Sequence, residues 1–99
     1  MKSITHPTLL LDETICRSNI KRMADKAEKH NLVFKPHMKT HQSAEIGQWL
    51  AEVGVTAITV SSLKMARYFA DHGWDDITIA FPCNTRAIPQ IDELASKIN

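Results

Sequence analysis

The residues best suited to chemistry lie close together, just after an apolar run. His37, Lys39 and His41 follow residues 32–34 and Pro36 within a short stretch. If the chain stays extended beyond the proline, the three side chains project to one side, because side chains alternate along a strand. An amine that is desolvated or flanked by cationic groups gives up its proton more easily and becomes a nucleophile toward a carbonyl carbon.

Three interpretations of this stretch stay open on residue type and spacing alone. It can be an ordinary polar loop between a strand and a helix, which spacing by itself favours. His37 and His41 can be metal ligands, although no nearby cysteine or acid completes the three or four ligands that a site needs. Lys39 can be a covalent amine that forms a Schiff base.

A weak internal repeat organises the chain around this stretch. Residues 54–60 align without gaps on residues 73–79, and each begins with a glycine followed by a β-branched run. Asn31 precedes the apolar residues 32–34 in the same way. Glycine and asparagine are the residue types that end a helix with a positive φ. The period of roughly 20 residues fits one strand, one helix and two loops.

Four helices are predicted between and after these strands. Asp12, Ser43 and either Ser61 or Ser62 are residue types that cap a helix N-terminus. A fourth helix is predicted to start at Arg86 or Ile88 and to run toward Lys97. Apolar residues recur at helical spacing after the three caps: Cys16, Ile20, Met23 and Ala27; Ile46, Leu50 and Val53; Leu63, Ala66 and Ala70.

Strands that alternate with helices favour a parallel sheet covered by helices. Three strands would leave both edges of that sheet unpaired, and a complete (β/α)8 barrel needs about 250 residues. We therefore predict an α/β fold, the N-terminal part of a TIM-like barrel with parallel strands that is incomplete in this chain. The last helix is expected to stop at Asn99 with no following strand to dock on. The carboxyl ends of barrel strands face the active site, where Lys39 would lie.

Composition argues against several classes of protein. The formal net charge is +1, so no electrostatic attraction to nucleic acid or acidic lipid is expected. No apolar run approaches the roughly 20 residues of a membrane span, and no secretory signal is visible. Cys16 and Cys83 lie far apart and in no CxxC pair, as expected of free thiols in a reducing compartment. We expect a cytoplasmic protein without nucleic-acid or membrane partners.

Residues 34–41, FKPHMKTH, resemble the RPHxKTHK motif of the D-threonine aldolase and D-serine dehydratase family. This family belongs to the alanine-racemase-like, fold-type III pyridoxal-phosphate enzymes. The resemblance is collinear over residues 6–83. Gln42 stands where the family usually has a second lysine, and Met65 where many members have glutamate. The segments that resemble the family besides the motif are residues 6–12, 19–23, 58–63, 66–73 and 75–82.

The resemblance implies a pyridoxal-phosphate-dependent lyase that acts on D-3-hydroxy amino acids by retro-aldol cleavage or dehydration. Lys39 would be the catalytic residue and would bind the cofactor through a Schiff base, and His37 would also contact the cofactor. No metal ligand is assigned in this chain, since a divalent metal would belong to a C-terminal domain outside it. A pyridoxal-phosphate-dependent racemase and a non-catalytic, partner-binding βα module are the alternatives.

The resemblance also implies how the chain is organised. Residues 1–99 would be the N-terminal portion of a pyridoxal-phosphate-binding, alanine-racemase-like barrel domain. Residues 1–12 would pair with a C-terminal β-domain that is absent here. The phosphate-binding loops would belong to later strands, so the isolated chain is expected to be inactive alone. The whole protein is expected to be a homodimer that takes a small amino-acid substrate.

Overall fold

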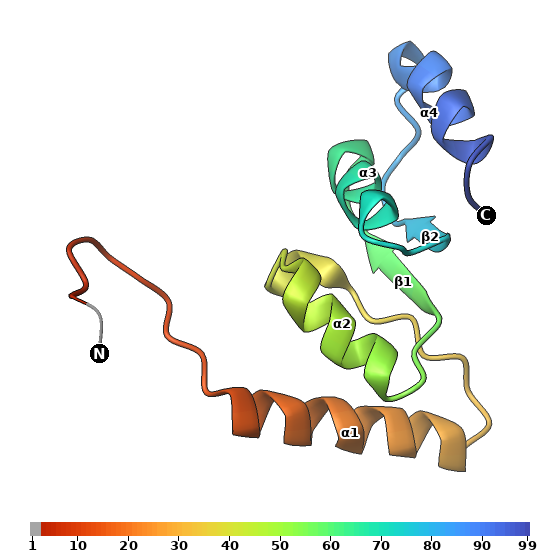
Figure 1. Ribbon diagram of the computed structural model, residues 1–99. Helices are drawn as coiled ribbons and strands as arrows, with labels where there is room; N and C mark the ends of the chain where they lie inside the picture. Colours follow the sequence, from red (N-terminus) through yellow and green to blue (C-terminus); the bar gives the residue numbers. More distant parts are fainter. Residues whose placement is uncertain (1–2) are drawn as a thin grey trace.

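The computed structural model describes residues 3–99, in which helices alternate with a short parallel sheet (Figure 1). Two short 3-10 helices, η1 and η2, precede α2 and α4. In chain order the elements are α1 (Glu13–Lys29), η1 (Met38–Thr40), α2 (Ala44–Glu52), β1 (Ala57–Val60), α3 (Leu63–Asp71), β2 (Asp76–Ile79), η2 (Thr85–Ala87) and α4 (Ile88–Ala95).

The helices begin where the predicted caps lie. Asp12, Ser43 and Ser62 each have extended backbone angles, and their side chains accept hydrogen bonds from the amides three residues further on. These bonds satisfy amides that the first turn of a helix leaves without a partner. The predicted starts of the first three helices are therefore confirmed, and Ser62 is the cap of the third.

The residues predicted to end the helices also have the expected backbone angles. Asn31, Gly54 and Gly73 have φ values of +53°, +91° and +96°. This left-handed region is open to glycine and tolerated by asparagine, and it turns the chain out of the helix. Each reversal sends the chain back toward the sheet, as the repeat predicted.

The sheet is parallel and is extended on one side by the segment that precedes Lys39. Ala57 of β1 pairs with Asp76 of β2, and the register continues to the pair Val60 and Ile79. On the other edge of β1, His37 forms a parallel bridge with Thr59, whose amide donates to Pro36 O at 2.9 Å. Residues 32–36 lie beside β1 but do not form the regular strand that the apolar run predicts.

The chain returns to the sheet at Asn99, which the sequence did not predict. Asn99 N donates to Asp75 O at 2.7 Å, and Ile77 N donates to Asn99 O at 3.3 Å. These two bonds have the pattern of a parallel ladder that flanks Asp76. The expected end of the last helix at Asn99 is wrong, because α4 ends at Ala95 and the backbone of Asn99 pairs with the open edge of β2; within residues 3–99 no strand follows α4, as expected.

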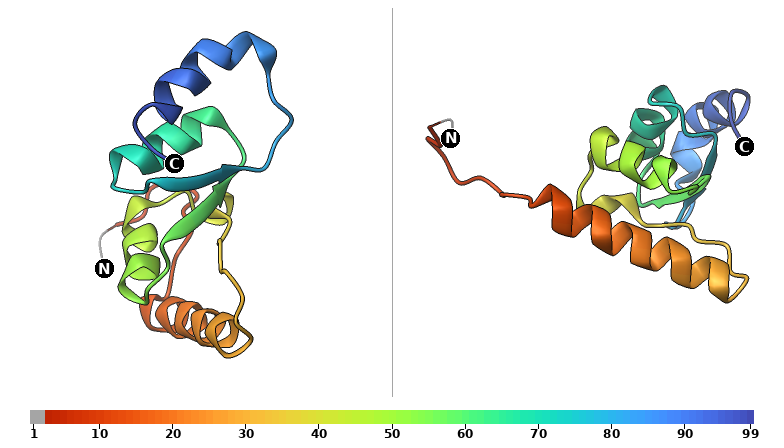
Figure 2. Two further views of the ribbon diagram at one scale, coloured as in Figure 1. Left: turned by 90° about the vertical axis from the view of Figure 1, so that its right-hand side faces the viewer. Right: turned by 60° about the horizontal axis from the view of Figure 1, so that its bottom comes forward.

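The core lies between one face of the sheet and helices α2, α3 and α4 (Figure 2). Ile58 and Val60 point into it and are fully buried, as are Phe69 of α3 and Met38 of η1. Because side chains alternate along a strand, Thr59 points to the opposite face. Covering one face with helices is what a βα repeat requires, since each strand is joined to the next by a helix.

Arg17 of helix α1 contacts two side chains of α2. The Arg17 guanidinium lies 4.6 Å from the centre of the Trp49 ring and donates to Glu52 Oε2 at 2.7 Å. The predicted apolar stripe of α1 packs only in part, since Ile20 meets the core while Met23 stays 48% exposed. The cation–π contact and the ion pair therefore supplement a weak apolar contact.

The N-terminal arm, residues 3–12, runs away from the rest of the molecule (Figures 1 and 2). It joins no strand, and the side chains of Leu9, Leu10 and Leu11 are exposed. The predicted pairing of residues 1–12 with a β-domain stays a prediction. Among residues 3–99, no helix combines the length and the apolar composition that a bilayer span requires.

Candidate active site

Lys39 lies on a short turn at the carboxyl end of the parallel strands. The bridge between His37 and Thr59 is the last pairing before the chain enters η1, and Ser61 follows β1 at the same edge. The turn that carries Lys39, residues 37–43, therefore occupies the end of the sheet where α/β proteins place their functional groups.

The chain does not stay extended after Pro36, because Met38 turns into the core. Met38 is fully buried and opens the 3-10 helix η1. Its terminal methyl group fits against Gly47 of α2, where an added Cβ would come within 3.1 Å of it. The expectation that His37, Lys39 and His41 share one strand face is therefore wrong. Burial of the large side chain between them outweighs continued strand geometry.

Hydrogen bonds within the turn hold its first half. His37 Nδ1 accepts a hydrogen bond from Lys39 N at 3.3 Å, and the hydroxyl of Thr40 donates to His37 O at 3.4 Å. The amide of Gln42 donates to Met38 O at 2.9 Å. His37 thus acts as the N-cap of η1, with its Nδ1 facing the backbone of the lysine.

The second half of the turn is held by His41. Its Nδ1 accepts a hydrogen bond from Ser43 N at 3.0 Å, and its ring packs in a T-shaped contact with Phe69. Burial disfavours the charged imidazolium and lowers the pKa of His41. The ring is therefore neutral at neutral pH, as its role of acceptor requires.

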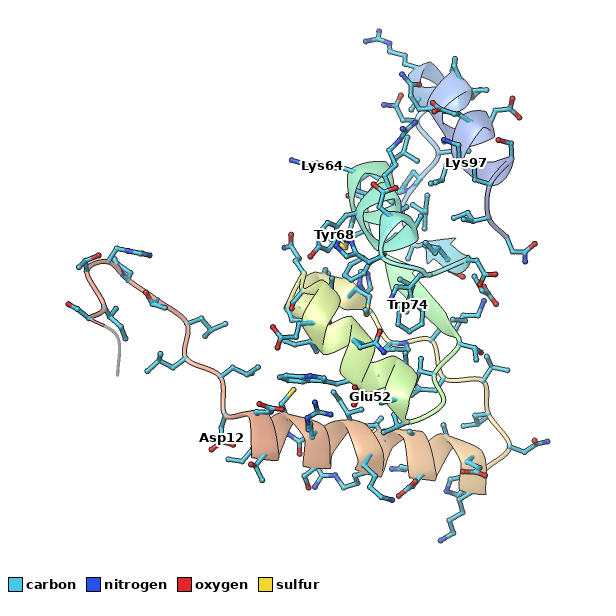
Figure 3. All side chains as sticks on the ribbon, in the orientation of Figure 1. Asp12, Glu52, Lys64, Tyr68, Trp74 and Lys97 are labelled. Atoms are coloured by element: carbon cyan, nitrogen blue, oxygen red, sulfur yellow. The ribbon has the colours of Figure 1, made fainter. Side chains whose placement is uncertain are left out.

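Tyr68 of α3 is a further residue of this region, which the sequence analysis did not single out. Its phenol oxygen accepts a hydrogen bond from Ala44 N at 3.0 Å, at the start of α2 (Figure 3). Nothing in its spacing indicates that role, because the contact joins two helices that are distant in sequence. It ties the end of the Lys39 turn to α3.

The side chain of Lys39 is exposed, and within residues 3–99 its amine has no ion-pair or hydrogen-bond partner. Lys35 differs from Lys39, because its Nζ forms an ion pair with Asp76 Oδ1 at 3.1 Å. The amine of Lys39 is therefore available for reaction, while Lys35 is already engaged. The desolvation expected of a nucleophilic lysine is not provided by the residues that the structure describes.

An apolar groove with a volume of about 410 Å³ runs behind the turn, between the start of α1 and α2. His37, Thr40 and His41 line it from the turn, and Leu10, Ile20 and Leu50 are among its apolar residues. Cys16 also lines it and is a free thiol, as is Cys83. Within residues 3–99, no three side chains of His, Cys, Asp or Glu gather as a metal site would need.

Comparison with known proteins identifies relatives for almost the whole chain. No protein-family model matches it. D-threo-3-hydroxyaspartate dehydratase of Delftia sp. strain HT23 is 31% identical over 88 residues, which are 89% of this chain and 23% of the relative. D-threonine aldolase of Arthrobacter sp. is 30% identical over 74 residues, 75% of this chain and 20% of the relative. D-serine dehydratase of Schizosaccharomyces pombe is 23% identical over 100 residues, 96% of this chain and 24% of the relative.

The solved structure of the Delftia dehydratase superposes on this chain with a TM-score of 0.90 and 28% identity, covering 96% of this chain and 25% of the dehydratase. This chain spans about a quarter of the length of these relatives. The structure here is a mixed α/β fold with parallel strands, as predicted. The resemblance found in the sequence is therefore confirmed, since the chain is similar to the N-terminal portion of D-threo-3-hydroxyaspartate dehydratase, D-serine dehydratase and D-threonine aldolase.

Proposed function

We propose that this chain is the N-terminal portion of a pyridoxal-phosphate-dependent lyase that acts on D-3-hydroxy amino acids. The observation that carries the proposal is the position of Lys39, on a hydrogen-bonded turn at the carboxyl end of parallel strands, within the segment that resembles the family motif. The relatives are named as dehydratases and an aldolase, which favours a lyase over a racemase or a non-catalytic module.

The proposed fold of the whole protein is a (β/α)8 barrel that begins with this chain. Both edges of the two-stranded sheet already carry further parallel pairings, at His37 on one side and at Asn99 on the other. A sheet that grows in parallel at both edges, with helices on one face, supports closure into a barrel. Residues 1–12 would then pair with a C-terminal β-domain.

The residues of the turn fit pyridoxal phosphate. This cofactor supplies an aldehyde that condenses with a primary amine, and a ring that withdraws electrons from the Cα of the substrate. The described part of the chain offers an exposed primary amine at Lys39 with no carboxylate bound to it. His37 is the second residue that we assign to the cofactor.

Lys39 would have two tasks. Its amine would hold the cofactor covalently and, once the substrate amine has replaced it, would move a proton at the substrate Cα. His37 accepts from Lys39 N through Nδ1, which leaves the N–H of the ring at Nε2. That N–H would donate a hydrogen bond to the cofactor. Residues outside this chain would decide whether the Cα–H or the Cα–Cβ bond breaks.

Other properties of the whole protein follow from the same proposal. Later barrel strands would bring the phosphate-binding loops and would enclose Lys39. A divalent metal would be held by the C-terminal domain. We propose a cytoplasmic homodimer, with which the two free thiols agree. Residues 1–99 alone would be inactive.

Trapping the cofactor tests the assignment of Lys39. Protein expressed from the complete reading frame is mixed with pyridoxal phosphate, reduced with borohydride and digested for mass spectrometry. We expect one reduced adduct, on the peptide that contains Lys39, and none in Lys39→Ala. Lys35→Ala is the matched control and keeps the adduct. A wild-type protein without an adduct, or an adduct that survives in Lys39→Ala, would refute the proposal.

Product analysis tests the reaction. A retro-aldol cleavage of D-threonine breaks the Cα–Cβ bond and yields glycine and acetaldehyde. A dehydration of D-serine or D-threo-3-hydroxyaspartate eliminates water from Cα and Cβ to leave an imine, and hydrolysis of that imine takes up a water and releases ammonia and a 2-oxo acid. Either set of carbonyl products supports a lyase. Appearance of the L-enantiomer without carbonyl products would instead establish the racemase.

A further inference from the structure

Two histidines bracket Lys39, and each uses the same ring atom in the same way. His37 Nδ1 accepts from Lys39 N at 3.3 Å, and His41 Nδ1 accepts from Ser43 N at 3.0 Å. Each ring thus binds the amide two residues further along the chain. Only a neutral imidazole can accept in this manner, because protonation places a hydrogen on both ring nitrogens.

The bond made by His41 spans a residue with an unfavourable backbone conformation. Gln42 has a φ of +51°, in the left-handed region that residues with a Cβ seldom adopt. The backbone amide of Gln42 donates a hydrogen bond to Met38 O at 2.9 Å, and the next backbone amide, that of Ser43, donates to His41 Nδ1. The left-handed residue is therefore restrained on both sides by hydrogen bonds.

The ring of His41 is itself positioned by the core. Its centroid lies 6.5 Å from that of Phe69, and the two ring planes meet at 83°. Phe69 is fully buried in α3. A half-buried ring in a T-shaped contact with a fixed aromatic side chain has few orientations open to it. The core thus orients the acceptor that holds the turn.

We propose that His41 is a positioning residue for Lys39. Its neutral ring holds residues 38–43 in one conformation, so that less backbone freedom is lost when the Lys39 amine captures the cofactor aldehyde. The importance of Lys39 here rests on the proposed function, whereas the restraint on the turn does not.

Few ionisable groups surround this ring. Helix α2 contributes the apolar side chains of Ile46 and Leu50 to the same groove. Burial is the cause that lowers the pKa of His41. The acceptor is therefore present at neutral pH and is lost only in acid. The titratable side chains that line the groove or adjoin Phe69 are Asp12 and Cys16 at the start of α1, His37 in the turn and Tyr68 in α3.

Three substitutions of His41 separate the effect of the hydrogen-bond acceptor at Nδ1 from the effect of the volume of the ring. His41→Asn places an oxygen acceptor where Nδ1 lies, His41→Gln places it where Nε2 lies, and His41→Leu has none. Pyridoxal 5'-phosphate is titrated into each variant of the whole protein, and the absorbance of the lysine-bound cofactor is followed. We expect the leucine and glutamine variants to bind it about fivefold to tenfold more weakly, and the asparagine variant within about twofold of wild type.

Amide hydrogen exchange without cofactor supplies the second readout. At about pH 7.5, the Ser43 amide should be protected in wild type and His41→Asn, and unprotected in His41→Leu. As the pH is lowered step by step through the depressed pKa of His41, wild type should lose this protection after correction for intrinsic exchange, whereas His41→Asn should keep it. A merely structural contribution of the ring volume would not produce this difference.

The two readouts fail in different ways. If His41→Asn behaves as His41→Leu in both, or if His41→Leu leaves cofactor affinity and Ser43 protection unchanged, the positioning role is refuted. A wild-type protein that takes up no cofactor would refute the proposed function. It would also refute the claim that the turn positions Lys39 for the cofactor. The exchange pattern would still decide whether His41 restrains the turn.

Discussion

The two faces of the short sheet differ in what they bury and in what they carry. On the helix-covered face, Ile58 and Val60 are fully buried against Phe69. On the opposite face, Lys35 Nζ reaches Asp76 Oδ1 at 3.1 Å and Thr78 Oγ1 at 3.4 Å, and both partners of the ion pair are partly exposed. One face is apolar and packed, and the other is polar and bonded across strands.

The register explains how the polar face is built. His37 pairs with Thr59, so Lys35 lies level with Ala57, and Ala57 pairs with Asp76. The small alanine between them lets the lysine side chain reach across to the carboxylate. In the proposed barrel this face would line the interior. We therefore expect the packed face to contribute most of the stability of the fold. The polar face would contribute less and would line the interior of the proposed barrel.

The largest effect is expected from removing the centre of the packed face. Phe69→Ala should lower the free energy of unfolding by about 3–5 kcal/mol, because the cavity adds to the lost apolar burial. That is a large part of the roughly 5–15 kcal/mol that stabilises a domain. Urea denaturation of the whole protein measures it. A loss below about 1 kcal/mol would show that the packed face does not dominate stability.

A smaller effect is expected where α2 approaches the turn. A Cβ at Gly47 would meet the methyl group of Met38 at 3.1 Å and Trp74 Nε1 at 3.2 Å. Gly47→Val should therefore destabilise the fold by about 1–3 kcal/mol through overpacking. Gln48→Val, on the exposed side of the same helix, serves as the control and should stay within about 1 kcal/mol. Equal midpoints of denaturation for the two variants would contradict this reading of the contact.

The polar face should contribute less. Partly exposed ion pairs couple by up to about 1 kcal/mol, so Lys35→Met should cost little stability. A double-mutant cycle with Asp76→Asn, by urea denaturation, measures the coupling directly. A coupling well above about 1 kcal/mol would contradict the ranking of the polar face below the packed face.

The smallest effect concerns pH. Burial lowers the pKa of His41 in the folded chain below that of the unfolded chain, near 6.5, so the unfolded chain binds more protons between the two values. The stabilisation is complete above pH 6.5 and declines as the pH falls through the folded pKa. We expect the denaturation midpoint to drop on acidification in wild type and less so in His41→Asn. Parallel profiles for the two proteins would argue against the assignment.

Sequence alone predicts the local features because each depends on neighbouring residues. Asp12, Ser43 and Ser62 cap helices through amides three positions away, and Asn31 and Gly54 leave helices through backbone angles that depend on residue type. These inferences need no knowledge of what lies across the core, which is why they agree with the structure.

The conformation of the site could not be predicted in this way. The inward rotation of Met38 depends on a space beside Gly47, in a helix that starts after the turn. The docking of Asn99 depends on an unpaired edge of β2, and the roles of His41 and Tyr68 depend on α3. Each is a contact between segments far apart in the chain.

Residue types and their periods thus determined where the first three helices begin and which two runs pair in the parallel sheet, while the resemblance to the family singled out Lys39. Only the tertiary structure decided that Lys39 sits on a turn between two backbone-binding histidines. The physical reason is that caps and left-handed residues are governed by energies within a few residues. The path of the chain after Pro36 is instead governed by the burial of Met38, which depends on the space beside Gly47 in another part of the chain.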